Sequence, residues 1–189
     1  MLDTPGNSEK ELIRNCIKGD ILSQERLYKH FYGYAMGVGL RYIFNREDAL
    51  EVVNDGFIKA FHSIGSFNKD HAFKPWLRKI IVNTAIDRRR KDMKHLQEVD
   101  LEHADHVHTQ AHIVERLSAQ DILKLLDFLP DIQRMVFNLY EIDGYTHEEV
   151  AEALNIPASS SRTYLSRAKD KLRKALVLQD QNSYERVGR

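Results

Sequence analysis

Residues 144–176, GYTHEEVAEALNIPASSSRTYLSRAKDKLRKAL, contain the clearest structural signal in this chain. Thr146 and Glu149 have the spacing of a capping box, which predicts the start of a short helix. The residues 155–157, Asn-Ile-Pro, predict a tight turn. From about Ser159 to Leu176 the apolar residues recur three and four apart, which predicts a second, longer helix. This order is typical of a helix-turn-helix, whose second helix enters the DNA major groove N-terminus first.

The predicted second helix begins with residues that can contact base edges. An arginine can pair bidentately with guanine, and serine and threonine hydroxyls can pair with several bases. The candidates are Ser159, Ser160, Ser161, Arg162 and Thr163. Cations further along the helix are expected to contact phosphates; these are Arg167, Lys169 and Lys171. The alternative is a helical hairpin with a solvated basic face, and the short helix, the turn and the clustered polar residues favour DNA binding over it.

The whole chain is predicted to be all-α. It has 9 glycines and 4 prolines in 189 residues, and its apolar residues recur at helical spacing. Ser8 and Asn45 are expected to begin helices. A further helix is expected from about residue 74 to 94, after a loop over 65–73. We therefore expect two small helical domains, 1–94 and 118–177, joined by a flexible linker at 95–117, and a disordered tail at 178–189.

The net charge of zero conceals local asymmetry. Residues 74–94 contain eight Lys or Arg and two Asp, a balance of +6, and residues 160–176 contain six and one, a balance of +5. Between them, residues 97–121 contain six acids and one Arg, a balance of −5. Two basic patches indicate two surfaces for a polyanion, although solvated helix faces would produce the same composition.

Several other classes of protein find little support. A single cysteine, Cys16, leaves no internal disulfide and no Cys pair for a metal. No signal peptide or membrane span is apparent, so we expect a soluble, cytoplasmic protein. No nucleophile–base pair or phosphate-binding Gly loop suggests an enzyme, and no cofactor is expected. A metal sensor using the linker histidines is a minor alternative, because no Cys or HExxH frames them; they are His103, His106, His108 and His112.

Three segments, in this order, resemble the extracytoplasmic-function (ECF) sigma factors, a branch of the sigma-70 family. The segment from Leu125 to Leu176 is similar to their region 4, REDALEVVNDGFIKAF (46–61) to region 2.2, and FKPWLRKIIVNTAIDRRRK (73–91) to regions 2.3 and 2.4. The resemblance covers roughly residues 9–177. It implies an alternative sigma factor, which binds core RNA polymerase and directs promoter-specific initiation, and which an anti-sigma factor, often membrane-tethered, controls.

The resemblance also implies roles for particular residues. The helix over 46–64 would bind the polymerase through an acidic face, with Asp48, Glu51, Asn54 and Asp55. Region 2 would open and bind the −10 element and capture a flipped base, with Phe67, Asn68, Lys69, Lys79, Asn83, Arg88, Arg89, Arg90 and Lys91. Region 4 would bind the −35 element through the residues named above. The recognition helix departs from the family at residues 159–161 and at Tyr164, which puts the −35 sequence in question.

A helix-turn-helix regulator that binds duplex DNA without polymerase is the main alternative. It accounts for residues 118–176. It leaves unexplained the acidic stripe of Asp48, Glu51 and Asp55 and the second basic helix.

Overall fold

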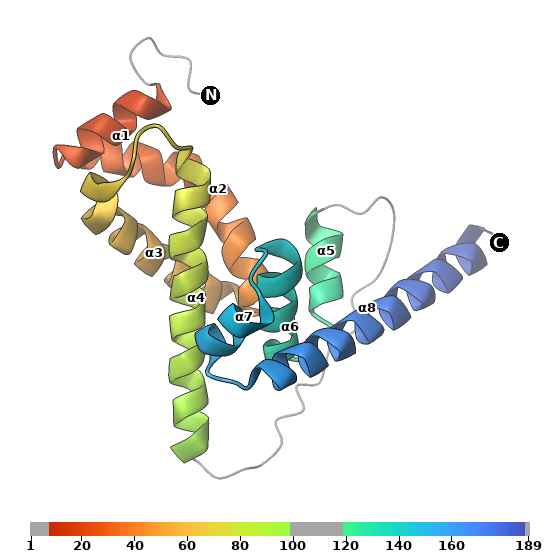
Figure 1. The fold of residues 1–189 in the computed structure, drawn as a ribbon. Coiled ribbons are helices and arrows are strands. Elements are labelled where there is room, and N and C mark those ends of the chain that lie inside the picture. Colours follow the sequence, from red (N-terminus) through yellow and green to blue (C-terminus); the bar gives the residue numbers. More distant parts are fainter. Residues whose placement is uncertain (1–7, 99–118, 188–189) are drawn as a thin grey trace. The chain divides into compact units, whose positions relative to one another are not determined.

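The computed structural model describes residues 8–98 and 119–187, and helices make up the regular structure of that part of the chain (Figure 1). The prediction of an all-α fold is confirmed. The chain divides into two compact units, Met1–Arg88 and Arg89–Arg189. Each unit is described below by itself.

The N-terminal unit contains helices α1 (Glu9–Ile17), α2 (Ile21–Tyr42) and α3 (Arg46–Ser63), a 3₁₀ turn (Ile64–Ser66) and the first part of α4 (Phe73–Glu98). Side chains just outside the helices accept hydrogen bonds from otherwise unpaired backbone N–H groups. Ser8 accepts from the Glu11 amide at 3.3 Å and Asn45 from the Glu47 amide at 2.7 Å, so both predicted caps are confirmed.

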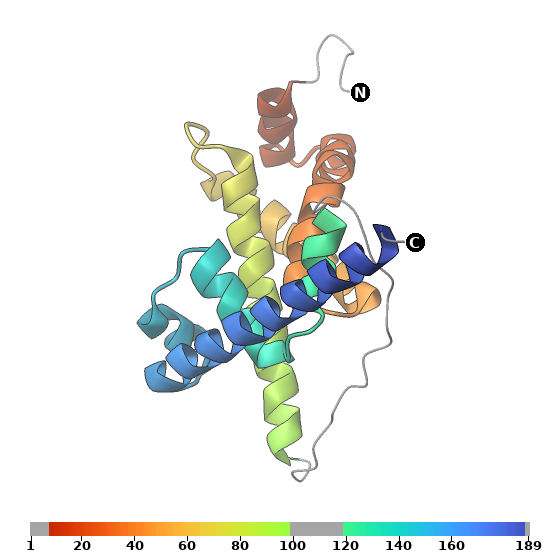
Figure 2. The same ribbon diagram turned by 90° about the vertical axis from the view of Figure 1, so that its right-hand side faces the viewer.

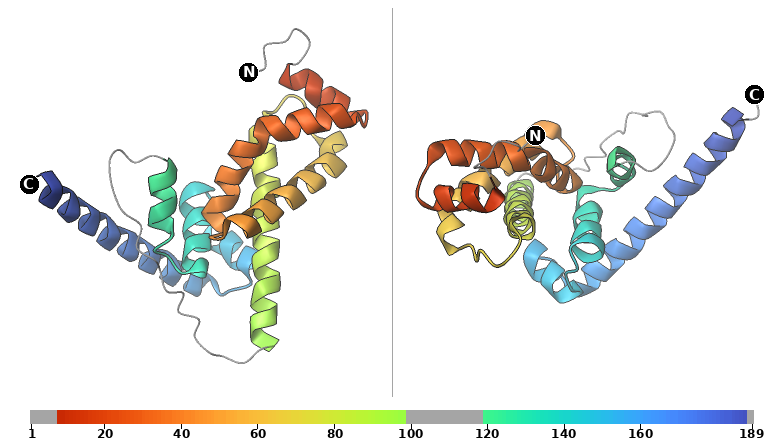
Figure 3. Two further views of the ribbon diagram at one scale, coloured as in Figure 1. Left: turned by 180° about the vertical axis from the view of Figure 1, so that it is seen from behind. Right: turned by 90° about the horizontal axis from the view of Figure 1, so that it is seen from above.

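Helix α2 lies against both α1 and α3 (Figure 3). The side chains that these helices and α4 turn inward form one apolar core, and each large one contributes on the order of 1.5–3 kcal/mol by leaving water. Its most deeply buried members include Leu12, Leu27, Phe31, Val52, Phe57, Leu77 and Ile81. The inward faces of α3 and α4 pack into this core, so their outward faces remain at the surface of the unit.

The C-terminal unit contains α5 (Ala119–Leu126), α6 (Asp131–Phe137), a π-helical turn (Asn138–Ile142), α7 (His147–Leu154) and α8 (Ala158–Val187). Within it, Leu126, Leu129 and Ala168 pack together, with Phe137 and Leu172 against them. The sequence pattern predicts a single helix over roughly residues 131–142, and the π turn interrupts it. The buried Asn138 marks the interruption, since its side-chain amide donates to the Arg134 carbonyl at 2.9 Å.

One expectation about the packing of α8 differs from the structure. The spacing of Leu165, Ala168, Leu172 and Leu176 in the sequence predicts that Leu176 is buried, but it is 40% exposed, whereas Ala175 is buried. Residue 175 lies seven positions after Ala168 and so returns to the same helix face, whereas 176 is rotated about 100° from 175 at 3.6 residues per turn.

Helix α4 extends to Glu98 and helix α8 extends to Val187 (Figure 1). No glycine or proline occurs in residues 76–98 or 158–187, so no residue of either segment breaks a helix by its backbone chemistry. The rest of the expected linker, and its four histidines, lie outside the described residues.

Candidate functional site

The short helix of the helix-turn-helix begins where the sequence predicts. The Thr146 amide donates to Glu149 Oε2 at 2.8 Å, and the Glu149 amide donates to Thr146 Oγ1 at 3.2 Å. These reciprocal bonds form a complete capping box. The hydrogen bonds from the Thr146 backbone and hydroxyl hold the pKa of Glu149 below its ordinary value.

The tight turn between α7 and α8 depends on Asn155. Its φ of 54° lies in the left-handed region, which asparagine tolerates better than most residues. The next amide, of Ile156, donates to the Ala151 carbonyl at 3.0 Å and so ends α7. Ile156 itself is half-buried. The turn lets α8 start three residues later in a new direction.

The first turn and a half of α8 presents three of its five predicted base-contacting side chains to solvent: Ser159, Arg162 and Thr163. Ser160 is half-buried. Ser161 is fully buried, and its Oγ lies 2.9 Å from Nδ1 of His147, so this side chain braces α8 and is not available to a base. The Thr163 hydroxyl donates back to the Ser159 carbonyl at 3.0 Å, which leaves its oxygen as an acceptor.

The basic residues predicted to contact phosphates lie on the exposed side of α8. They are Arg167, Lys169 and Lys171. Lys169 also forms an ion pair with Glu141 at 2.6 Å. Exposed ion pairs of this kind contribute little stability, about 0–1 kcal/mol, so a phosphate can replace the carboxylate readily.

Two residues at the start of α7 contact two residues at the start of α8. His147 meets Ser161 as described and stacks on Tyr140 with ring centroids 4.3 Å apart. Glu148 Oε1 accepts from Arg162 Nη2 at 2.7 Å. The sequence gives no signal for His147 and Glu148 as part of the site. Each lies 14 residues from its partner, a separation that no helical periodicity links.

The acidic face of α3 carries the predicted polymerase contacts. Glu51, Asn54 and Asp55 are exposed and Asp48 is half-exposed. The Tyr28 hydroxyl donates to Asn54 Oδ1 at 3.0 Å. The structure thus brings these four residues onto one surface of the N-terminal unit.

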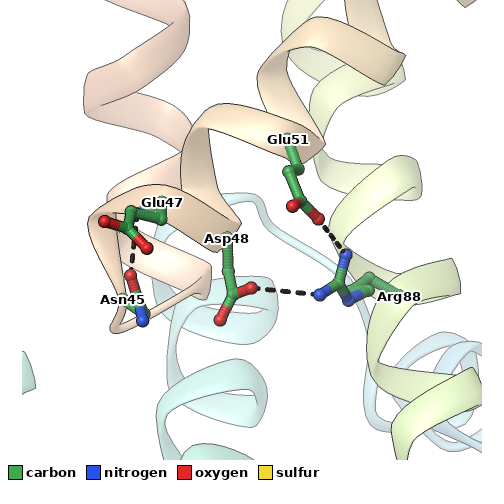
Figure 4. Close-up of polar contacts among 5 residues, drawn as sticks. All are labelled: Asn45, Glu47, Asp48, Glu51 and Arg88. Carbon is green, nitrogen blue, oxygen red and sulfur yellow. Dashed lines mark hydrogen bonds and ion pairs between the residues drawn. The ribbon is translucent and has the colours of Figure 1, made fainter.

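Arg88 of α4 joins this acidic face (Figure 4). Its Nη2 donates to Asp48 Oδ1 at 3.0 Å and its Nη1 to Glu51 Oε2 at 2.7 Å. The resemblance to ECF sigma factors implies a DNA contact for Arg88 and polymerase contacts for the two acids. In the structure Arg88 pairs with both acids and so neutralises part of the acidic face.

The loop between α3 and α4 lies at the N-terminal end of α4 (Figure 2). Phe67 is only 6% exposed and packs on Phe73 and Trp76, with ring centroids 5.5 and 5.2 Å away. It is therefore an anchor of the loop. Asn68 and Lys69 are exposed, as predicted for a nucleic-acid contact.

An open hollow of about 460 Å³ lies beside this loop. Its wall combines aromatic rings with polar groups, which is the chemistry that holds an unstacked base. The lining residues are Ser66, Phe67, Asn68, His71, Ala72, Pro75 and Trp76.

Most of the other predicted DNA contacts on α4 are exposed to solvent. Lys79, Asn83, Arg90 and Lys91 are exposed, and Arg89 is half-buried. Lys79 and Asn83 lie four residues apart, so they are neighbours on one helix face. This face combines a cation with an amide that can bond to a base edge.

Neither a membrane helix nor a metal cluster occurs in residues 8–98 and 119–187. No helix there is long and apolar enough to cross a bilayer. No group of three or more His, Cys, Asp or Glu side chains is placed to hold a metal ion.

Comparison with known families supplies the class of the protein. The model "Sigma-70 region 2" matches residues 27–95, and "Sigma-70, region 4" matches residues 119–172. Together these matches span more than half of the chain. The protein belongs to the ECF branch of the sigma-70 family, whose members are non-enzymatic initiation factors that bind RNA polymerase and promoter DNA.

Individual relatives agree with this assignment. The chain is 26% identical over 180 residues to the RNA polymerase sigma-H factor of Pseudomonas aeruginosa, covering 89% of this chain and 93% of the relative. It is 29% identical over 176 residues to the ECF RNA polymerase sigma-E factor of Haemophilus influenzae, with coverages of 86% and 92%. A solved structure of the sigma factor RpoE in complex with the anti-sigma factor NepR, from Bartonella quintana, has the same fold; the TM-score is 0.51, the identity 22%, and the coverages 80% and 95%.

Proposed function

We propose that this sigma factor contacts the −35 element of its promoters through the N-terminal turns of α8. The carrying observation is the exposure of Ser159, Arg162 and Thr163 on the helix that follows a tight turn. The leading residues of such a helix are the ones that reach base edges in the major groove. The exposed cations further along α8 would hold phosphates and set the register.

The N-terminal unit would contact the −10 element. The hollow beside Trp76 can accept an extruded base, and Asn68 and Lys69 stand exposed at the loop. Removing a base from the stack costs a few kcal/mol, which stacking and phosphate contacts together can offset. Lys79, Asn83, Arg90 and Lys91 would bind the strand along α4.

The acidic face of α3 would dock on a basic surface of core RNA polymerase. Glu51, Asn54 and Asp55 are exposed on it, and charge complementarity speeds and orients such an encounter. Because Arg88 shares this face, a basic surface of the polymerase competes with an internal cation for Asp48 and Glu51.

Control by an anti-sigma factor is part of this proposal. The support is the sigma factor of Bartonella quintana, which has this fold and was solved with its anti-sigma factor bound. Such a partner would hold the protein inactive until a signal arrives. We place this activity in the cytoplasm of a bacterium, where core polymerase and promoters are found, with the anti-sigma factor as the route to the membrane.

The decisive experiment is run-off transcription with sigma-free bacterial core polymerase on fragmented genomic DNA from the source. Discrete transcripts that require this protein would support the proposal and reveal both promoter elements. Asp55→Asn should reduce them by weakening the docking face. Asp70→Asn, which removes an exposed acid from outside that face, is the matched control for polymerase binding.

The absence of protein-dependent transcripts would count against the proposal. If no protein-dependent transcript forms and the protein does not co-migrate with core polymerase, the promoter proposal fails. Tight, specific binding of the isolated protein to a duplex operator would then indicate a regulator that acts without polymerase.

A further inference from the structure

Arg162 at the start of α8 forms an ion pair with Glu148 of the preceding helix. Arg162 is exposed, and its Nη2 donates to Glu148 Oε1 at 2.7 Å. The relative exposures of the two side chains are 56% and 67%, so the pair lies at the surface that meets solvent. An arginine has five N–H donors in a planar fork, and this contact uses one of them. The other donors stay free for a base.

The neighbouring contacts hold this pair in place. Ser161, one residue before Arg162, is fully buried against His147, one residue before Glu148. His147 in turn stacks on Tyr140. Two consecutive residues of α7 therefore meet two consecutive residues of α8, which fixes the backbone of both members of the ion pair. Glu148 also sits in the first turn of α7, where a carboxylate is stabilised by the helix dipole.

Of the exposed leading residues, Arg162 has the longest reach and the most donors. Ser159 is short, and the Thr163 hydroxyl already donates to the Ser159 carbonyl. Discrimination between bases at this helix therefore rests mainly on where the guanidinium points. A free arginine side chain samples many rotamers, and restricting it before binding reduces what is lost when it pairs with guanine.

We propose that Glu148 is a specificity-determining positioning residue, whose carboxylate orients Arg162 toward one base pair of the upstream promoter element. This rests on the proposed function. Glu148 makes no base contact in this proposal. It narrows the positions that Arg162 can take, and so it affects discrimination at the base pair that Arg162 contacts and at no other.

The test uses holoenzyme assembled from core polymerase and the full-length protein. The templates are a promoter found by run-off transcription and a panel in which each upstream base pair is changed singly. Arg162→Ala should lose about tenfold or more in discrimination at one base pair, the worth of a bidentate contact. Glu148→Ala should lose about two- to fivefold at the same base pair, the range set by an exposed ion pair.

Three variants separate orientation from other effects. In an Arg162→Ala background, Glu148→Ala should cause no further loss of discrimination between bases. Glu148→Gln, which keeps an acceptor oxygen at the same reach, should recover part of the discrimination. Glu152→Ala removes an equal charge from the same helix and should alter all templates alike. Thermal unfolding of each variant verifies that the unit still folds.

Two outcomes would overturn the proposal. One is that Glu148→Ala raises or lowers transcription equally on every template, because that reports charge repulsion or stability alone. The other is that it leaves discrimination intact. In both cases wild-type holoenzyme still initiates at the promoter, so the result is distinct from failure of the sigma function itself, which would abolish the wild-type transcripts.

Discussion

A Cβ atom added to Gly56 of α3 would lie 2.3 Å from Cδ1 of Ile81 on α4. Ile81 is fully buried, so its terminal methyl has little room to move. A side chain at this position would therefore force the end of the Ile81 side chain to shift. The close approach of α3 and α4 brings Arg88, two turns further along α4, within reach of Asp48 and Glu51.

We expect Gly56→Ala to destabilise the N-terminal unit. Overpacking a core costs about 1–3 kcal/mol, and the better helix propensity of alanine returns about 0.5–1 kcal/mol. The net loss should therefore be up to about 2.5 kcal/mol, measured as a lower urea midpoint with an unchanged slope.

Gly33→Ala is the matched control in α2. Its Cβ would meet nothing within 4 Å, and the residue is exposed in mid-helix. Only the propensity gain then remains, so this variant should be more stable by about 0.5–1 kcal/mol. Equal midpoints for the two variants would show that the α3–α4 contact is not as close as described.

The capping box at Glu149 predicts a particular pH dependence. The pKa of Glu149 is lowered from its ordinary value of 4.5, mainly by the hydrogen bond from the Thr146 amide. A lowered folded-state pKa adds stability above the ordinary value, and this is lost as the pH falls through the lowered one. Glu149→Gln should therefore be less stable than the wild type at about pH 6, and the difference should shrink toward about pH 3.

Chemical unfolding at several pH values measures this difference. Glu152→Gln, on the same helix without a role in the cap, should show a smaller pH dependence. If the difference in stability between the wild type and Glu149→Gln instead grew as the pH fell, the pH dependence would have the opposite sign. The capping box would then not be the cause of that difference.

Cys16 should be unreactive in the folded protein. It is 2% exposed, and burial followed by the nearby Asp20 carboxylate raises the pKa of its thiol to about 11. The thiolate is the reactive form, so alkylation at about pH 8 should be slow and should accelerate greatly on unfolding. As the single cysteine of the chain, it reports on the N-terminal unit alone.

The measurement is the rate of iodoacetamide modification with increasing urea. The urea midpoint of this modification should coincide with the midpoint at which the N-terminal unit unfolds in circular dichroism. Rapid modification without denaturant would mean that α1 opens readily and that Cys16 is not held in the core.

Arg88→Gln should strengthen binding to core polymerase. The variant removes the internal cation that shares Asp48 and Glu51, so a basic polymerase surface meets more negative charge. The gain should be about two- to fivefold, since partly exposed ion pairs contribute up to about 1 kcal/mol. Competition binding of labelled protein to core polymerase measures it.

Asp48→Asn supplies the complementary result. It should weaken polymerase binding, and Arg88→Gln should then add less than it does in the wild type. Lys79→Gln removes an exposed cation from the same helix and should leave polymerase affinity unchanged. If Arg88→Gln weakens binding as much as Asp48→Asn does, the arginine supports docking and does not compete with it.

The local features of the fold were predictable because short-range physics produces them. The capping oxygen of Asn45 and the reciprocal box of Thr146 and Glu149 act within three residues, and the structure confirms both. The turn at Asn155 follows from the same local chemistry. Helix ends were less predictable, because α4 and α8 continue through residues whose sequence carries no strong stop signal.

The candidate site shows where such reasoning ends. Phe67 and Ser161 have side chains suited to contact nucleic acid, and the structure buries both. Nothing in the spacing of either residue indicates that Trp76 or His147 covers it. Burial of a single residue depends on neighbours that are distant in sequence.

The sequence by itself determined the all-helical class, the two basic segments and the position of the helix-turn-helix, because periodicity and caps act over one or two turns. Only the tertiary structure decided that Arg88 meets Asp48 and Glu51 and that Glu148 meets Arg162. Those partners are 14 to 40 residues apart. Their meeting depends on how closely helices pack, which a glycine facing an isoleucine permits and which no local pattern records.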